Sequence, residues 1–258
     1  MAPKPSIDLN SDLGEGYGAW AMGEDAKMLA IVTSANIACG GHAGDAETMF
    51  ATVTQARANA VTVGAHPGYS DRPGFGRRII PMSVAEIERM VATQIGALMG
   101  AAALAGVPVR YVKAHGALAN LAADTKDVAG AIARATAAVS RDLALLAISG
   151  TELETAGTAA GLQVFSEVFA DRAYLPNGRL VPRSHPQAMI HDAEVAANRL
   201  TTLLETGLMP TLNGAPIPLA AQSICVHGDS PGAVAMARHI RAMLQIAGIA
   251  VAPFLPPR

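Results

Sequence analysis

The sequence alternates short apolar runs with longer segments of helical character. Seven runs predict strands, at residues 7–12, 35–39, 61–66, 109–115, 143–149, 162–169 and 223–227, and a weaker eighth lies at 249–254. The intervening segments predict helices over residues 24–32, 45–59, 83–106, 116–139, 151–160, 186–206 and 231–247. Because parallel strands need crossover connections, these repeated strand–helix units predict a parallel sheet with helices outside it.

Local signals mark the starts of three of these helices. Residues 83–86 and 151–154 have the Ser/Thr-x-x-Glu spacing of a capping box, in which the two side chains bond each other's backbone N–H groups. Residues 230–231 are Ser-Pro, a capping residue followed by proline at the first helical position. These signals support the predicted helix boundaries.

The predicted architecture is an α/β fold in one domain over residues 1–258, because no low-complexity tract, charge block or Ser/Gly linker divides the chain. An open doubly wound sheet and a closed barrel both satisfy the pattern. Seven strands favour a TIM-like barrel, one strand short of the usual eight or closed by residues 249–254. Two connections, 67–82 and 170–185, are long and contain proline and arginine, which favours a functional role.

Composition narrows the classes of protein. Hydrophobic residues make up 51% of the chain, and the mean hydropathy of +0.30 excludes an extended disordered protein. Nineteen Lys and Arg balance 21 Asp and Glu, which argues against a nucleic-acid binder. Two cysteines and no apolar leader favour the cytoplasm. The uncharged stretch 90–109 is rich in Ala and Gly and continues from a capping box, so we expect a soluble helix and no membrane segment.

Polar and ionisable residues collect where the predicted strands end. In α/β barrels and sheets the carboxyl ends of the strands meet at the edge where ligands bind, so this pattern predicts an active site. The residues concerned, in chain order, are Asp8, Asn10, Asp12, Glu15, Asn36, His42, His66, Lys113, His115, Glu167, His227 and Asp229.

The residue types suggest roles. Asp12 and Glu15 are expected to coordinate a metal ion or to act as acid and base. His42 and His66, on adjacent strand ends beside carboxylates, are candidate metal ligands or general bases. Lys113 faces inward by period-two alternation, and a buried lysine needs a partner, so it is a candidate to hold a substrate carboxylate or phosphate.

Other residues have competing interpretations. Glu167 is either a further catalytic carboxylate or a structural partner of the buried lysine, and Asp8 is as consistent with a satisfied buried group as with a catalytic one. Asp45 is most simply a helix N-cap. Asp229 either supports the last helix or belongs to an anion cradle at its N-terminus. Arg78 is either solvated or a lid contact to substrate.

Several nucleotide-site and nucleophile motifs are absent from the sequence, namely GxxxxGK[ST], GxGxxG after a strand, and GxSxG. An ATP site would therefore be unconventional or completed by a partner.

Eight motifs resemble the LamB/YcsF family, in order and over residues 7–253. They lie at residues 8–15, 35–45, 64–69, 74–78, 112–118, 167–172, 180–183 and 224–229. The chain departs from the family pattern at Ser11, where cysteine is frequent, at Gly41, where an aromatic residue is usual, and at Ala114 and Ala119, where proline and tyrosine are common. No candidate catalytic group is lost.

The resemblance implies a fold similar to the seven-stranded barrel of the glycoside hydrolase/deacetylase group. It also implies ATP-dependent opening of 5-oxo-L-proline to L-glutamate, together with subunits B and C of a bacterial 5-oxoprolinase. The family resemblance is also compatible with assembly of this chain into a homo-oligomer.

On that basis the chain's side chains receive hypothetical roles. Lys113 would hold the substrate carboxylate or phosphate, with further substrate contacts from Asn10, Asn36, Arg78 and Asp229. Water would be activated by Asp12, His42 and His66, with a divalent metal ion on these three residues as one route, and protons would be transferred by His115 and Glu167.

Two alternatives stay open. The first is a metal-dependent amide hydrolase or deacetylase that acts on a small or sugar-derived substrate without ATP or partners. The second is a non-catalytic subunit that only binds the substrate.

Overall fold

Seven parallel strands close into a barrel in the computed structural model, which describes residues 6–229 and 232–255. They are β1 (Ser6–Leu13), β2 (Ser34–Ala38), β3 (Thr62–His66), β4 (Val109–Val112), β5 (Ala144–Ile148), β6 (Val164–Phe169) and β9 (Ser223–Cys225). Each strand pairs with the next, and β9 returns to β1, with Asp8 opposite Ser223. This closure confirms the TIM-like barrel and excludes the open sheet.

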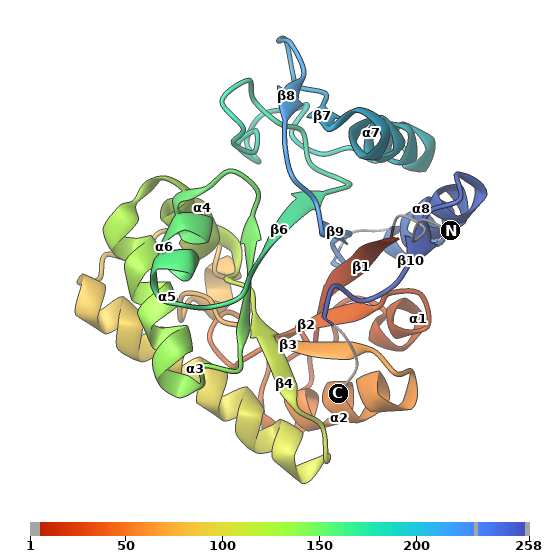
Figure 1. Cartoon of the computed structure of the whole chain (residues 1–258). Helices are drawn as coiled ribbons and strands as arrows, with labels where there is room; N and C mark the ends of the chain where they lie inside the picture. The colour runs from red at the N-terminus through yellow and green to blue at the C-terminus, as the bar shows by residue number, and fades with distance from the viewer. Residues whose placement is uncertain (1–5, 230–231, 256–258) are drawn as a thin grey trace.

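Helices surround the barrel on its outside, where they cover the outward-facing apolar side chains of the strands (Figure 1). They are α1 (Asp25–Leu29), α2 (Ala46–Ala58), α3 (Val84–Leu104), α4 (Gly116–Asp124), α5 (Lys126–Val139), α6 (Glu152–Ala159), α7 (Ala193–Thr206) and α8 (Ala233–Ile246). The long connection after β3 adds a short 3₁₀ helix, η1 (Arg72–Gly74).

The structure confirms two of the predicted helix caps and contradicts one. Ser83 forms the predicted capping box, and Asp45 caps α2 by accepting a hydrogen bond from the N–H of Thr48 at 2.8 Å. The box predicted at Thr151 is wrong, because its hydroxyl donates to the carbonyl of Ile148 instead. The Ser-Pro start predicted at 230–231 lies outside the described residues.

The structure differs from the sequence prediction in four larger respects. The helix expected over 116–139 breaks at Thr125, whose extended backbone ends α4 and starts α5. The helix expected from 186 starts only after Asp192, which accepts hydrogen bonds from two N–H groups of the first turn. Residues 249–254 do not close the barrel, since β10 (Ala250–Val251) pairs only with the start of β1. The antiparallel pair β7 (Leu208–Met209) and β8 (Ile217–Pro218) was not predicted.

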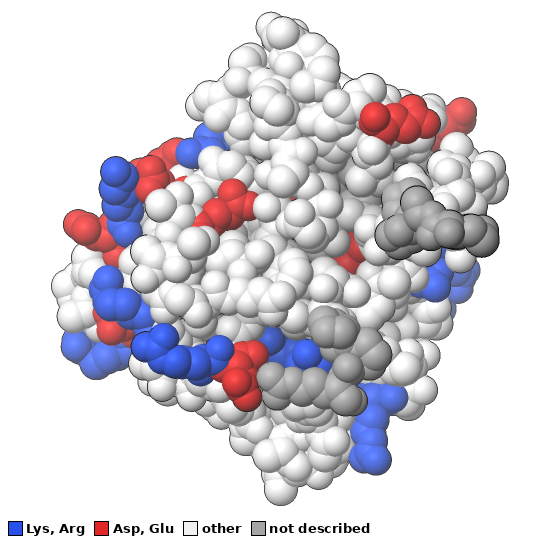
Figure 2. All heavy atoms as spheres, in the orientation of Figure 1, with Lys and Arg blue, Asp and Glu red and all other residues white. Residues whose placement is uncertain are grey.

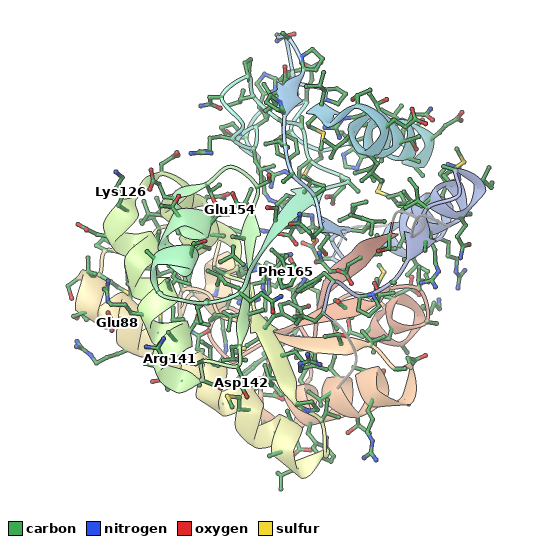
Figure 3. The ribbon with its side chains drawn as sticks, in the orientation of Figure 1. Glu88, Lys126, Arg141, Asp142, Glu154 and Phe165 are labelled. Atoms are coloured by element: carbon green, nitrogen blue, oxygen red, sulfur yellow. The ribbon has the colours of Figure 1, made fainter. Side chains whose placement is uncertain are left out.

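The outer surface carries charges of both signs. In Figure 2, blue and red side chains alternate along the edge of the molecule formed by the outer helices. Figure 3 shows two of them, Glu88 on α3 and Lys126 on α5, projecting away from the barrel. Within residues 6–229 and 232–255, no helix combines the length and the apolar character needed to cross a membrane.

Polar side chains fill much of the barrel interior, where parallel barrels usually place branched apolar ones. Among those on β1, Asp8 lies nearest the amino-terminal end of the strand, and it is fully buried. Its carboxylate accepts hydrogen bonds from the hydroxyls of Thr33 at 2.7 Å, Ser34 at 2.6 Å and Ser223. The interpretation of Asp8 as a satisfied buried group agrees with these contacts.

Burial of Asp8 makes folding stability depend on pH. Burial raises the pKa of this carboxyl to about 6, and the three hydroxyl donors offset only part of that effect. The folded state therefore keeps a proton that the unfolded chain has already lost, so stability falls as the pH rises from about 4 to about 7. Asp8→Asn, which stays neutral, should gain on the order of 3 kcal/mol relative to wild type over this range.

Urea unfolding at several pH values, followed by circular dichroism, measures that difference. The exposed Asp127→Asn variant is the matched control. Parallel stability profiles for the wild type and Asp8→Asn would show that Asp8 ionises normally in the folded state.

Candidate active site

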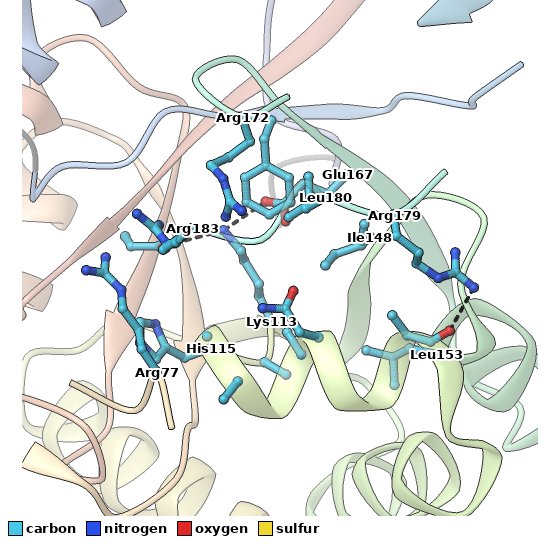
Figure 4. Close-up of a pocket in the computed structure, with 18 of the residues that line it drawn as sticks. Arg77, Lys113, His115, Ile148, Leu153, Glu167, Arg172, Arg179, Leu180 and Arg183 are labelled. Carbon is cyan, nitrogen blue, oxygen red and sulfur yellow. Dashed lines mark hydrogen bonds and ion pairs between the residues drawn. The ribbon is translucent and has the colours of Figure 1, made fainter. Parts of the chain in front are cut away.

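A cavity of about 510 Å³, here called the barrel-mouth cavity, opens at the carboxyl ends of the strands (Figure 4). Its lining includes six of the strand-end residues singled out above, which come from β1, β3, β4, β6 and β9 or the residues soon after them. These are Asp12, His66, Lys113, His115, Glu167 and His227. The strand-end prediction thus placed these groups together correctly.

Lys113 lies between two carboxylates inside the barrel. Its Nζ is 2.8 Å from Asp12 Oδ1 and 2.9 Å from Glu167 Oε1, and all three side chains are at least nine-tenths buried. Burial alone lowers the pKa of Lys113, but Asp12 and the other acidic neighbours raise it well above its usual value. Burial raises the pKa of Asp12, yet His66 and Lys113 hold it well below the ordinary range. Lys113 and Asp12 therefore form a buried ion pair.

The remaining carboxylate oxygen of Glu167 is available for chemistry. Its Oε2 is buried and has no hydrogen-bond partner among the described residues. Burial raises the pKa of Glu167, and the charge of Lys113 offsets part of that rise. A buried carboxyl group with a raised pKa and a free oxygen is a candidate to accept or deliver a proton.

Asn10 and Asn36 lie behind this ion pair rather than on the cavity lining. Asn10 donates to Glu167 Oε1 at 3.0 Å and to Ser223 Oγ at 2.7 Å. Asn36 donates to Asp12 Oδ1 at 2.8 Å and accepts from the hydroxyl of Tyr111 at 2.6 Å. The two amides hydrogen-bond the carboxylates that line the cavity, and neither amide is itself part of the lining.

Three histidines and Glu15 form a second buried group beside the cavity. The rings of His42 and His115 are stacked with centroids 3.6 Å apart, and His66 meets His115 edge-on. His42 Nε2 lies 3.2 Å from Glu15 Oε1, and His115 Nδ1 lies 3.0 Å from His66 Nε2. Gly76, at a φ of +61°, allows this packing, since a Cβ there would lie 2.7 Å from that of His42.

Backbone carbonyls determine which ring nitrogens carry hydrogen. His66 Nδ1 lies 2.8 Å from the carbonyl oxygen of Lys113, and His115 Nε2 lies 2.8 Å from that of Phe75. A carbonyl only accepts, so both nitrogens must donate. When the rings are neutral, their other nitrogens, His66 Nε2 and His115 Nδ1, are bare lone pairs 3.0 Å apart. Two facing lone pairs need a proton or a cation between them.

This group could hold a divalent metal ion. The donor atoms of Glu15, His42, His66 and His115 all lie within 4.8 Å of one another. Ligands about 2.0–2.1 Å from a tetrahedral zinc ion are about 3.3 Å apart, close to the spacings given above. Carbonyl partners behind two of the rings are the support that metal-bound histidines usually have. Burial and neighbouring histidines lower the pKa of His42 and His115 well below the usual value, which keeps them neutral as ligands.

The grouping keeps two members of the expected metal set, loses the third and adds two others. The sequence suggested Asp12 with His42 and His66, but the structure groups these two histidines with Glu15 and His115. Asp12 lies instead within 4.8 Å of donor atoms of Cys225 and His227. Lys113 already donates to Asp12 and to Cys225 Sγ, at 2.8 and 3.1 Å, so its positive charge disfavours a cation there.

A carboxylate–histidine pair, Asp171 with His227, was not predicted as a pair from the sequence, although His227 was among the strand-end residues. His227 Nδ1 lies 2.8 Å from Asp171 Oδ2, so it donates to that carboxylate and leaves Nε2 toward Arg183 at 3.3 Å. His227 lines the cavity. The signal was present, because Asp171 and His227 both follow strand ends, but nothing in the sequence pairs residues 56 positions apart.

Two expected substrate contacts lie outside the cavity lining. Arg78 is bound to Asp71 in its own loop, and its side chain is 62% exposed. Asp229 forms an ion pair at 2.5 Å with Arg77, which does line the cavity. Asp229 therefore reaches the site only through its arginine partner.

Fold and site together define the class of protein: a parallel (βα) barrel with buried acid–base groups at the strand ends. The model of the LamB/YcsF family matches residues 7–257, and the chain belongs to this family.

Relatives agree over nearly the whole length. The chain is 50% identical over 250 residues to the 5-oxoprolinase A subunit of Nitrobacter hamburgensis, which covers 96% of this chain and 98% of the relative. A crystal structure of a lactam utilization protein from Thermus thermophilus has a TM-score of 0.90 at 41% identity, covering 96% and 99% of the two chains. A putative cellobiose-phosphate cleavage protein from Enterococcus faecalis shares only the fold, with a TM-score of 0.58, 11% identity and 98% of each chain covered.

Proposed function

We propose that this chain is the lactam-opening component of an ATP-dependent 5-oxoprolinase that converts 5-oxo-L-proline to L-glutamate with companion subunits B and C, in the cytoplasm. The names of the relatives, one the A subunit of a 5-oxoprolinase and one a lactam utilization protein, support the substrate class. The observation that carries the proposal is the buried set of Asp12, His66, Lys113 and Glu167 on one cavity.

The chemistry explains why such a site needs ATP. A lactam is a resonance-stabilised amide with no good leaving group. Transfer of a phosphoryl group to its oxygen makes the ring carbon electrophilic. Water then adds to that carbon, the C–N bond breaks as the ring nitrogen takes up a proton, and a second water releases phosphate from the resulting acyl phosphate. What the barrel must then supply is a base for water, a proton for the ring nitrogen and stabilisation of developing negative charge. ATP itself would bind with the companion subunits, which agrees with the missing nucleotide motifs.

The side chains of the cavity fit these tasks. Asp12 Oδ2 lies 3.3 Å from His66 Nε2, and this pair would activate water. Glu167, with its free buried oxygen, would transfer protons. His115 would share this role only while its Nδ1 holds no metal ion, because its Nε2 donates to the carbonyl oxygen of Phe75. Lys113 already has two carboxylate partners, so its role is to stabilise developing negative charge rather than to hold the substrate carboxylate alone.

The proposal includes a divalent metal ion held by Glu15, His42, His66 and His115. When bound, such an ion supplies Lewis acidity to a carbonyl or phosphoryl oxygen.

Zinc titration of the chain tests the metal proposal. His42→Ala should weaken zinc binding by at least about 10–100-fold, since even loss of an outer partner of a ligand has that effect. His185→Ala, at an exposed histidine of the loop 170–185, is the matched control and should bind zinc as the wild type does. Equal zinc affinity in all three proteins would contradict the assignment.

The function itself is tested by reconstitution. The purified chain, mixed with its B and C partners, ATP and 5-oxo-L-proline, should form glutamate and ADP together, and omission of any component should abolish glutamate. A metal-dependent deacetylase, the alternative favoured by the histidine cluster, would instead act without ATP or partners and stop with a chelator. Turnover of an acetylated sugar by the chain alone would replace the proposal with that alternative.

A further inference from the structure

Three arginines gather on one side of the barrel-mouth cavity. Arg77 comes from the loop after β3, and Arg172 and Arg183 come from the loop after β6. Figure 4 shows them on one side of Lys113, whereas the labelled apolar side chains lie on the other, namely Ile148, Leu153 and Leu180. The cavity thus has one side with three arginines and another where apolar side chains lie around Arg179.

Arg172 is buried without a carboxylate hydrogen-bonded to it. Arg172 is only 4% exposed. One guanidinium nitrogen donates to the carbonyl of Val181 at 2.7 Å, and Nε has no partner among the described residues. The adjacent Asp171 accepts hydrogen bonds from His227. A buried guanidinium with an idle N–H costs free energy unless a ligand satisfies it.

Arg183 likewise has no carboxylate hydrogen-bonded to it, although this residue is exposed. Its guanidinium lies 3.3 Å from His227 Nε2 and donates to the sulfur of Met189 at 3.4 Å, and neither partner is a carboxylate. Arg77 is bound to a carboxylate, Asp229. Burial, and to a smaller extent the charge of Arg183, lower the pKa of Arg172 to about 10.

The other cations of the cavity are already neutralised. Lys113 has Asp12 and Glu167, and Arg179 has Asp124 at 2.5 Å. The unbalanced positive charge is therefore confined to the side formed by Arg172 and Arg183.

We propose that Arg172 and Arg183, assisted by Arg77, form a subsite for a phosphoryl group. Guanidinium groups bind phosphate oxygens with paired N–H donors, and a tetrahedral dianion can use donors that converge from two loops. A planar carboxylate is satisfied by the paired N–H donors of a single guanidinium group. The assignment rests on the proposed function, because it places at this subsite the phosphoryl group that activates the lactam or the phosphate released with the product.

Binding of inorganic phosphate to the full-length chain tests the subsite without ATP, lactam or partners. Phosphate should bind saturably at low ionic strength, in a titration followed by calorimetry. Arg183→Gln, a change at an exposed position, should weaken binding at least about tenfold, and Arg172→Gln should do the same if circular dichroism shows a folded chain. Arg134→Gln, whose arginine pairs with Glu88 on the outer helices, is the matched control and should bind phosphate normally.

Acetate and 5-oxo-L-proline, titrated at the same ionic strength, distinguish a phosphoryl subsite from a carboxylate subsite. Weaker binding of acetate than of phosphate, and 5-oxo-L-proline binding that survives Arg183→Gln, support the phosphoryl assignment. Equal affinity for acetate and phosphate would overturn it, as would phosphate binding that is absent or unchanged in Arg183→Gln. None of these results depends on glutamate formation, so failure of the subsite and failure of the proposed function are separately visible.

Discussion

Replacement of Lys113 with methionine should destabilise the folded chain by about 3–5 kcal/mol, the cost of leaving a buried charge without its partner. Methionine fills much of the same volume, so the effect isolates the charge. Asp12 and Glu167 would remain fully enclosed with no ammonium within 3 Å of either. Protonation of the two carboxylates relieves the repulsion, so the loss of stability should shrink as the pH falls.

Urea unfolding followed by circular dichroism measures this effect. The single tryptophan, Trp20, is 75% exposed and is a poor reporter of the barrel. Lys126→Met, at an exposed lysine on α5, is the matched control and should change stability by no more than about 0.5 kcal/mol. Adding Glu167→Gln to Lys113→Met should recover part of the loss. A Lys113→Met variant as stable as Lys126→Met would show that the three groups do not depend on one another.

His66→Ala should lower kcat for glutamate formation in the reconstituted complex by about 10²–10⁴-fold, the usual contribution of a positioned acid or base. The His66 ring links the ion pair of Asp12 to the histidine cluster, because its Nε2 lies 3.3 Å from Asp12 and 3.0 Å from His115. Its Nδ1 donates to the carbonyl oxygen of Lys113. Alanine removes all of these contacts at once.

Two controls separate chemistry from structure in that experiment. His185→Ala should turn over at the wild-type rate, and His66→Ala should still assemble with the partners and unfold near the wild-type temperature. Asp12→Asn, which breaks the same pair from the other side, should also lose activity. Wild-type turnover by both folded variants would remove His66 and Asp12 from the reaction.

Residues within strands were the easiest to predict. Period-two alternation placed Asp8, Asn10 and Asp12 inside the barrel, and all three are at least nine-tenths buried there. Lys113 and His115 follow the same rule just beyond the end of β4. Strand ends converge by topology, so the site could be located from sequence without any coordinates.

Loop residues were harder, because no period governs them. Arg78 was expected to contact substrate, but it binds Asp71 in the turn around η1. Glu15 and His42 both lie after strand ends, yet their 3.2 Å contact depends on how two loops fold against each other. Likewise the break at Thr125 reflects a single extended residue within a continuous helical pattern.

The central claim is that 5-oxo-L-proline binds in the barrel-mouth cavity, and a crystal structure of this chain with that ligand tests it most directly. We expect the lactam ring in the cavity, with its amide within hydrogen-bonding distance of the group formed by Asp12, His66, Lys113 and Glu167. An ordered ligand bound elsewhere on the chain at saturating concentration, with this cavity empty, would contradict the account.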